Sequence, residues 1–163
     1  SQEVTMVITL SHSDTARIQA DPGSKAGLGT QYFWLSKGTF DFFPALTEKN
    51  RRGIKNTYSC NINMNYIDLG ITKPARVTFE ADNNLDFRLG TGAFRYTKKA
   101  DENDLAVISR ISEYDYEIRI VPQNSRHYSR LLAYATTFIG NYGKRFGYIS
   151  NDECFQILDD ETE

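Results

Sequence analysis

The chain has 163 residues, of which 40% are hydrophobic and 13% aromatic. This length predicts one domain, and this composition supplies a core, so a disordered chain is excluded. No apolar run approaches the roughly 18 residues of a membrane span, and the polar start at Ser1 is not that of a signal peptide. Because the chain begins with Ser rather than Met, we expect a piece of a longer protein.

The two cysteines, Cys60 and Cys154, lie at no metal-ligand spacing from each other or from either histidine. We therefore expect two free thiols in a reducing cytoplasm, and neither a metal site nor another cofactor.

The formal net charge of −2 is unusual for a protein that binds polyanions, but the charges are unevenly placed. Residues 152–163 contain six of the 21 acidic residues and none of the 19 basic ones, so 15 acids face 19 bases in residues 1–151 and leave that part at +4. The sequence therefore predicts a mildly basic domain over residues 1–151 and a solvated acidic tail over residues 152–163.

The first part of the chain alternates between strand patterns and polar segments. Val4–Leu10 is a dense β-branched run that predicts a buried strand, and Tyr32–Leu35 predicts a second strand. Between them, Ser11–Gln31 shows no apolar periodicity, and such a long loop in a compact domain is more often functional than idle. A short helix is expected over Ser36–Phe43, and Lys49–Lys55 is a basic turn.

Alternating residues predict further strands in the middle of the chain. They are Thr57–Tyr66, Ala75–Ala81 and Ala93–Tyr96, followed by a hairpin of Leu105–Ser112 with Tyr116–Val121. The segment Asp82–Gly92, by contrast, is polar and rich in turn residues.

Ser125–Phe138 carries apolar residues at helical spacing and predicts the one long helix, with Gly140 as its C-cap. Tyr142–Ile149 then returns to a strand pattern. About seven strands, two helices and no regular alternation of strand and helix predict a mostly β fold, built as an antiparallel sheet or open barrel.

Patterns typical of catalysis are weak. His12, Ser13 and Asp14 are the residue types of a hydrolase triad, but adjacent residues do not face one another in triad geometry. Neither histidine is followed two residues later by Lys, which argues against a phospholipase-D-type phosphodiesterase, and no acidic cluster suits a metal nuclease. An enzyme that acts on nucleic acid by itself is therefore a disfavoured alternative.

Two polar segments, Ser11–Gln31 and Asp82–Gly92, are candidate arms for DNA binding. In the major groove Arg pairs with guanine, Asn and Gln with adenine, and Asp with cytosine, while Ser, Thr and Lys suit phosphates. The candidate DNA-binding residues are Ser13, Asp14, Thr15, Arg17, Gln19 and Lys25 in the first arm, Asn83, Asn84, Asp86, Arg88, Thr91 and Arg95 in or beside the second, and Lys55 in the basic turn.

A competing interpretation concerns Lys144–Ile149, which is similar to the aromatic strand of an RNA-recognition motif. In such a strand Phe146 and Tyr148 would stack on the bases of single-stranded nucleic acid or RNA. The simpler alternative is that the two rings alternate with the core.

Five segments together carry a family resemblance, and they are Thr15–Ala20, Gln31–Lys37, Asn63–Tyr66, Asp86–Gly92 and Gly143–Arg145. Together they resemble the carboxy-terminal DNA-recognition domains of BfiI-type restriction endonucleases. The similarity extends over nearly the whole chain, and no single motif carries it.

The resemblance implies a fold like the plant B-three transcription-factor domain, a seven-stranded open pseudobarrel with two short helices. Two arms of that fold grip the major groove of double-stranded DNA, and here they would be Ser11–Gln31 and about Asp82–Arg95. The family's DNA-binding positions fall on Arg17, Trp34, Arg52, Arg76 and Lys144.

The resemblance also implies a larger parent enzyme in the bacterial cytoplasm. Its amino-terminal nuclease domain would be phospholipase-D-like, independent of metal and homodimeric. The present chain would be a monomeric, non-catalytic reader of an asymmetric site such as 5′-ACTGGG-3′, and the nuclease domain would cut at a fixed offset, as type IIS enzymes do.

Overall fold

The computed structural model describes residues 3–52, 55–81, 86–140 and 143–162, with the backbone alone for residues 51, 52 and 55. One ten-stranded sheet makes up most of this part of the chain. The strands are β1 Val4–Thr9, β2 Tyr32–Leu35, β3 Glu48–Arg52, β4 Lys55–Tyr66, β5 Ile71–Glu80, β6 Asp86–Gly90, β7 Leu105–Arg110, β8 Asp115–Val121, β9 Thr137–Ile139 and β10 Lys144–Ser150. The helices are α1 His12–Gln19, α2 Tyr128–Leu132 and α3 Asn151–Asp159, and the 3₁₀ turns are η1 Lys25–Gly27, η2 Lys37–Phe42 and η3 Gly92–Phe94.

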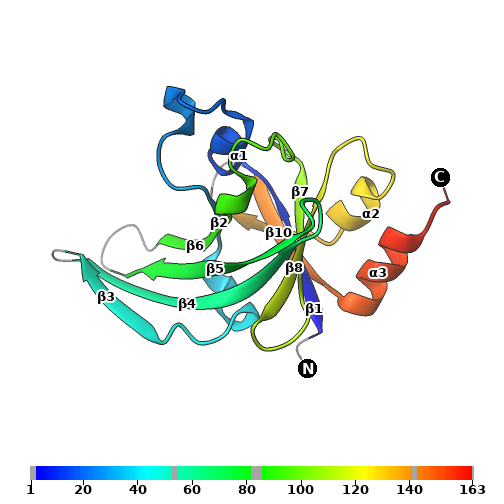
Figure 1. Cartoon of the computed structure of the whole chain (residues 1–163). Coiled ribbons are helices and arrows are strands. Elements are labelled where there is room, and N and C mark those ends of the chain that lie inside the picture. The colour runs from blue at the N-terminus through cyan, green and yellow to red at the C-terminus, as the bar shows by residue number, and fades with distance from the viewer. Residues whose placement is uncertain (1–2, 53–54, 82–85, 141–142, 163) are drawn as a thin grey trace.

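The strands follow the order β2-β6-β5-β4-β8-β7-β1-β10-β9, and β3 pairs with β4 beside this path. Among the described pairs only β4 and β8 run parallel. The sheet curls into the open, mostly β pseudobarrel seen in Figure 1, which confirms the predicted fold class. The strand number exceeds the expected seven because the short segments β3, β6 and β9 also pair with longer neighbours.

Two apolar clusters stabilise this sheet. The larger fills the inside of the curve, where Met6, Phe33 and Leu89 are buried. The smaller lies on the other face of β1, β7 and β10, under α2 and α3, and includes Val7. Both faces of β1 are therefore covered, which explains why its sequence is apolar nearly throughout, as predicted for a buried strand.

The predicted long helix over Ser125–Phe138 is wrong. Helix α2 ends at Leu132, and the chain then turns back so that Thr137–Ile139 pairs with β10 as β9. The turning backbone passes directly over Gly147 of β10, where an added Cβ would lie 1.6 Å from the carbonyl oxygen of Tyr134. The apolar residues at helical spacing instead belong to α2, where Leu131 is buried, and to the segment after it, where Ala135 is buried.

The predicted solvated tail is also wrong for most of its length. Asn151–Asp159 forms α3, which begins after the N-cap Ser150, whose hydroxyl accepts a hydrogen bond from the backbone amide of Glu153 at 3.2 Å. Cys154 and Ile157 on its inner side are buried in the smaller cluster. Acidic composition alone therefore did not indicate that this segment packs on the sheet.

Helix α1 lies in the first arm, where only a loop was predicted. Ser11 and Asp14 form a reciprocal capping box, in which Ser11 Oγ accepts from the Asp14 amide at 3.3 Å and Asp14 Oδ2 accepts from the Ser11 amide at 2.8 Å. Two smaller predictions fail as well: Ala93–Tyr96 contains part of η3 rather than a strand, and Gly140, with φ of +65°, lies after β9 rather than at a helix end.

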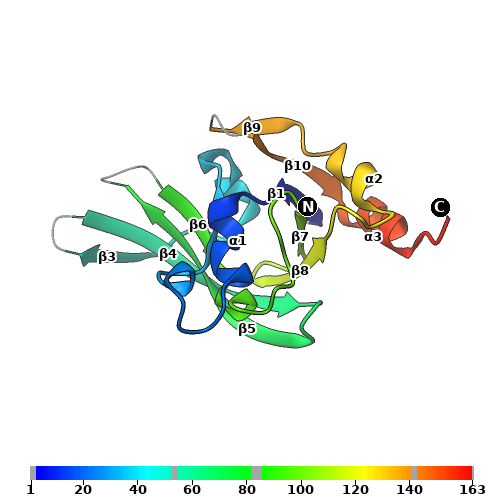
Figure 2. The ribbon, with the colours of Figure 1, turned by 90° about the horizontal axis from the view of Figure 1, so that it is seen from above.

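Figure 1 shows α1 and η1 projecting above β2 and β6, while the β3–β4 hairpin extends from the lower part of the same side. Figure 2, seen from above, places α2 and α3 on the opposite side of the molecule, beside β10 and β1. In the part of the chain that the structure describes, no helix is long and apolar enough to cross a membrane.

Candidate functional site

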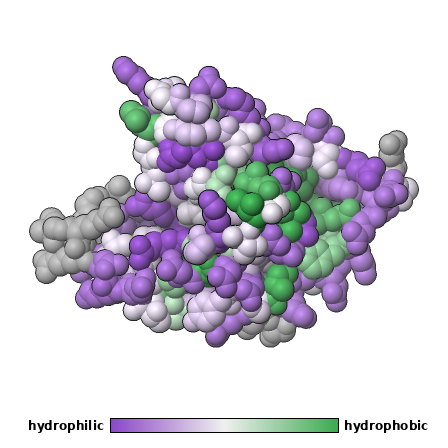
Figure 3. Space-filling model, in the orientation of Figure 1, coloured by the Kyte–Doolittle hydropathy of each residue, from purple (hydrophilic) through white to green (hydrophobic). Residues whose placement is uncertain are grey.

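A polar hollow lies on the outward face of β2 to β6, and the first arm projects beside it. It is lined by Thr30, Tyr32, Asn50, Thr57, Ser59, Arg76, Thr78, Glu80, Arg88 and Gly90. Strand alternation produces this face, because Arg76, Thr78 and Glu80 of β5 alternate with Ala75 and Val77, which are buried. In Figure 3 the surface over β3 to β5 and over the projecting arm is mostly hydrophilic.

Two arginines give the hollow its donors. Arg76 is 52% exposed, and its Nη2 lies 2.9 Å from Glu48 Oε2. Arg88 is 26% exposed, and its Nη2 lies 3.2 Å from Glu80 Oε2 while its Nε lies 3.5 Å from Asp86 Oδ2. The predicted candidates Arg76, Arg88 and Asp86 thus lie together at one surface, although they come from two strands.

Tyr32 joins this surface to the first arm. The guanidinium of Arg88 lies over its ring at 4.5 Å from the centroid, and that of Arg17 lies 6.0 Å from the same centroid. Arg17 Nη2 also donates to the carbonyl of Ser13 at 2.5 Å. An arginine of α1 and an arginine of β6 are therefore both in contact with one aromatic ring.

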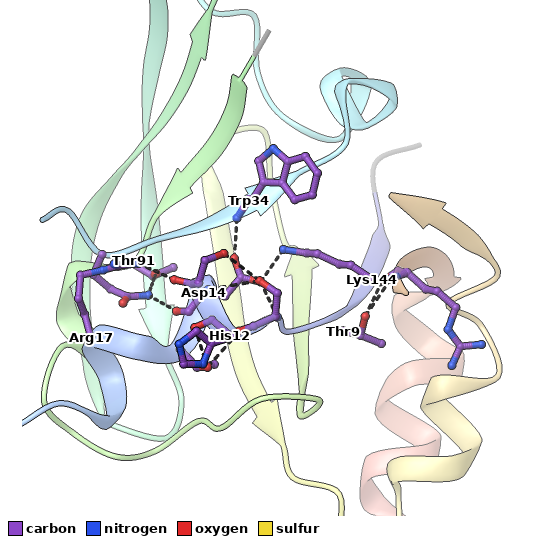
Figure 4. Close-up of polar contacts among 12 residues, drawn as sticks. Thr9, His12, Asp14, Arg17, Trp34, Thr91 and Lys144 are labelled. Atoms are coloured by element: carbon purple, nitrogen blue, oxygen red, sulfur yellow. Dashed lines mark hydrogen bonds and ion pairs between the residues drawn. The ribbon is translucent and has the colours of Figure 1, made fainter. Parts of the chain in front are cut away.

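Asp14 is the centre of a buried polar cluster, shown in Figure 4. Its Oδ2 accepts from Lys144 Nζ at 2.5 Å, and its Oδ1 accepts from the backbone amide of Trp34 at 2.9 Å. The side chains of Lys144 and Asp14 are only 2% and 1% exposed. This carboxylate therefore ties α1, β2 and β10 together at one point.

Lys144 and Asp14 are buried, whereas a direct contact with DNA would require exposed side chains. Burial lowers the pKa of the Lys144 ammonium below its usual value, and the neighbouring Asp14 carboxylate opposes that shift. The Lys144 ammonium also lies 5.6 Å from the centroid of the Trp34 ring. In this conformation the buried Lys144 side chain bridges β10 to α1 through Asp14.

The back of the first arm rests on the segment that follows β6. Both guanidinium Nη atoms of Arg95 donate to backbone carbonyls of the first arm, those of Gly27 and Gly29. The Gln19 amide donates to the carbonyl of Ala100 at 2.8 Å. The buried Gln31 amide donates at 3.1 Å to Thr91 Oγ1. These contacts hold the arm in place from within the protein.

The remaining predicted residues fall into three groups. Ser13 and Lys25 are exposed on the first arm. Thr15 and Thr91 are buried, so they support the arms from inside. The backbones of Arg52 and Lys55 pair across the β3–β4 hairpin, but their side chains lie outside the described residues, as do Asn83 and Asn84 entirely.

The alternative site for single-stranded nucleic acid or RNA loses one of its two rings. Phe146 is 7% exposed within the larger apolar cluster, whereas Tyr148 is 40% exposed. Their rings meet edge to face at 5.9 Å. Phe146 is therefore committed to the core, as the simpler interpretation of this strand predicted.

Of the ten lining residues only Arg76 and Arg88 were predicted site residues, and the eight that were missed include Tyr32, Ser59 and Glu80. The signal for one of them was present, because the alternation in Ala75–Ala81 already places Glu80 on the same face as Arg76. The others depend on pairing between strands that are distant in sequence, which no local pattern reveals.

The curled, open sheet defines the class of pseudobarrel folds. Within that class, the family model for the metal-independent restriction enzyme BfiI DNA-binding domain matches residues 1–160. The chain belongs to this family, which confirms the resemblance found in its sequence.

A solved structure of similar fold is the N-terminal domain of Helicobacter pylori LlaJI.R1. It is 14% identical, with a TM-score of 0.50, and the match covers 87% of this chain and 96% of that one. At this identity the likeness concerns the fold alone. None of the curated proteins matches the chain.

Proposed function

We propose that this chain binds double-stranded DNA sequence-specifically, with the hollow facing the major groove. The observation that carries the proposal is that Arg76 and Arg88 lie on one polar face, between the first arm and the β3–β4 hairpin. The chain is also a member of a DNA-binding family. Arginine forks suit guanine edges, and the B-DNA major groove is about 12 Å wide, so it admits a projecting element of this size.

The exposed candidates divide by chemistry. Arg17, Arg76 and Arg88 lie at or beside the hollow and are proposed to read base edges, while Ser13 and Lys25 on the projecting arm suit phosphates. For Arg52, Lys55, Asn83 and Asn84 the sequence and the family resemblance alone support a DNA contact.

The candidates that are held by contacts within the protein are proposed to act as positioning residues. Asp14 and Lys144 fix α1 against β2 and β10, and Arg95 holds the turn of the first arm through its carbonyls. Thr15, Thr91 and Gln19 support the same arm from inside, and Trp34 packs beside Lys144. A rigid arm presents its exposed side chains without a large ordering cost on binding.

The parent protein is proposed to be a type IIS restriction endonuclease. In it this domain would read an asymmetric site such as 5′-ACTGGG-3′, and a homodimeric, metal-independent, phospholipase-D-like nuclease domain would make the cut. Three consecutive guanines offer paired acceptors to Arg17, Arg76 and Arg88, which matches the arginines gathered at the hollow.

A gel-shift titration tests this function. The chain is titrated against a duplex that carries 5′-ACTGGG-3′ and against a duplex of the same composition with the site scrambled, each at two salt concentrations. We expect tighter binding to the first duplex, by about 10³-fold or more, and weaker binding to both at higher salt. Equal affinity for the two duplexes would refute reading of this site.

A further inference from the structure

Three carboxylates lie within ion-pair distance of the two arginines of the hollow, Glu80 in its lining and Glu48 and Asp86 beside it. Arg76 pairs with Glu48, and Arg88 pairs with Glu80 and Asp86. A surface that binds phosphates through charge alone is not expected to contain these carboxylates, because each carboxylate repels the DNA backbone.

The contacts of Arg76 fix the direction of its fork. Its Nη2 donates to Glu48 Oε2 at 2.9 Å, and its Nε donates to Ser59 Oγ at 3.2 Å. Ser59 Oγ in turn donates to Glu48 Oε2 at 3.4 Å, so Glu48, Ser59 and Arg76 are all hydrogen-bonded to one another. The side chain is held at two of its three nitrogens.

Arg88 is held in a similar way by different partners. Its Nη2 donates to Glu80 Oε2 at 3.2 Å, its Nε lies 3.5 Å from Asp86 Oδ2, and its plane lies over the ring of Tyr32. Both arginines thus keep one Nη group that takes no part in the ion pairs described here, while their positive charge is balanced locally.

We propose that Glu48 and Glu80 are specificity-determining residues, which orient Arg76 and Arg88 toward base edges. They also prevent the two arginines from binding DNA phosphates regardless of the base sequence. The inference rests on the proposed function. A neutral guanine acceptor can use the remaining N–H groups of a paired guanidinium, whereas a phosphate must compete with the carboxylate and is repelled by it. The acids lower affinity for every sequence that lacks the right bases.

The test uses the substitutions Glu48→Gln and Glu80→Gln. The matched control for Glu80→Gln is Glu117→Gln, because Glu117 forms an equally close pair with Arg119, at 3.1 Å and with similar exposure, on the side of the sheet covered by α3. The preferred duplex is the one that the unaltered chain selects from a randomised library. The second probe is a scrambled version of that duplex, and thermal unfolding shows that each variant is folded.

We expect Glu48→Gln and Glu80→Gln to bind the scrambled duplex more tightly and to reduce the ratio of the two affinities by about tenfold. The salt dependence of binding to the scrambled duplex should steepen by about 0.9 in logarithmic slope for each freed arginine. Glu117→Gln should leave the ratio and the slope unchanged.

Two outcomes distinguish failure of this inference from failure of the proposed function. If affinity for both duplexes rises by the same factor, so that the ratio is constant, the acids contribute only net charge and the inference is wrong while the proposed function stands. If the unaltered chain enriches no sequence from the library, sequence-specific binding itself is refuted, and the inference falls with it.

Discussion

Asp14 accepts hydrogen bonds from the backbone amides of Ser11 and Trp34 and from the ammonium of Lys144. Removing two charges from water costs several kcal/mol for each ion, and attraction offsets this only where the remaining polar atoms are also satisfied. Asp14 meets that condition with donors on both oxygens. The pair is therefore a point where three elements are joined, and it can be broken only at a large energetic cost.

Replacing Lys144 by Met should lower the free energy of unfolding by roughly 3–5 kcal/mol, because it leaves the Asp14 carboxylate buried without its cation. Urea unfolding followed by fluorescence measures this change. Lys25→Met, at an exposed position of the first arm, is the control and should stay within about 0.5 kcal/mol. A Lys144→Met chain with normal stability that no longer binds DNA would assign Lys144 a direct contact instead.

Replacing Arg17 by Ala should weaken binding to the preferred duplex by roughly 1–3 kcal/mol if its fork reads a base. Arg126→Ala, an exposed arginine ahead of α2 on the far side of the molecule, serves as the control. Titrations of both variants against the preferred and the scrambled duplex measure the effect. An equal loss on both duplexes would mark Arg17 as a phosphate contact.

Which candidate residues lie at the surface was only partly predictable. Arg76 occupies an outward position of a strand that its alternation predicted, whereas Arg88 was predicted in a polar, turn-rich segment and lies in strand β6. Lys144 and Asp14 are 130 residues apart, and only the packing of β10 against α1 shows that each neutralises the other. A charged residue in a polar segment is exposed by default, and burial requires a partner that sequence spacing does not reveal.

At the scale of elements, the sequence pattern missed one helix, α1, and predicted a long helix where only the short α2 forms. α1 begins with the capping box of Ser11 and Asp14, a local signature that was present in the sequence, but the helix is short and weakly amphipathic. Ser125–Phe138 has strong helical spacing but only one helical turn, since the backbone must reach β10 and cross over Gly147. Tertiary contacts decided both outcomes.

Replacing Gly147 by Ala should destabilise the fold by several kcal/mol, since the new Cβ would lie 1.6 Å from the Tyr134 carbonyl oxygen and the backbones would have to separate. Gly92→Ala is a matched control, because a Cβ there meets nothing within 4 Å and its φ is not in the left-handed region. Thermal unfolding midpoints compare the two. A Gly147→Ala chain as stable as Gly92→Ala would contradict the close crossing of the two segments.

At the scale of the molecule, the outer face of the curled sheet is divided into two regions. Over β1, β7 and β10 it carries α2 and α3 on the smaller apolar cluster, and over β2 to β6 it carries the polar hollow. Fold class followed from strand patterns and from the family resemblance, whereas strand number did not. β3, β6 and β9 are short, and their residues form strands because longer neighbours offer unpaired backbone groups.

The molecule should lose stability in alkaline solution. Burial raises the pKa of Tyr66 and of Tyr148 to about 12 and raises that of Tyr116 as well. The folded chain therefore keeps protons that the unfolded chain loses, so stability is complete below about pH 10 and falls as the pH rises toward 12. Lys144 acts in the opposite direction, because its lowered pKa favours folding as the pH approaches its ordinary value.

Substituting Tyr66 by Phe isolates the tyrosine contribution. Tyr66 is 2% exposed, and burial raises its pKa to about 12, which corresponds to roughly 2–3 kcal/mol of stability lost between about pH 10 and pH 12. Urea midpoints across this range should fall less steeply for Tyr66→Phe than for the unaltered chain. Identical slopes would show that Tyr66 titrates normally in the folded state.

A structure of the chain bound to its preferred duplex tests whether DNA lies against the hollow. We predict that α1 and the β3–β4 hairpin flank one major groove, with Arg76 and Arg88 of the hollow facing base edges and Lys144 still paired with Asp14. A complex in which the duplex lies against α2 and α3, or in which the hollow faces solvent, would contradict this placement.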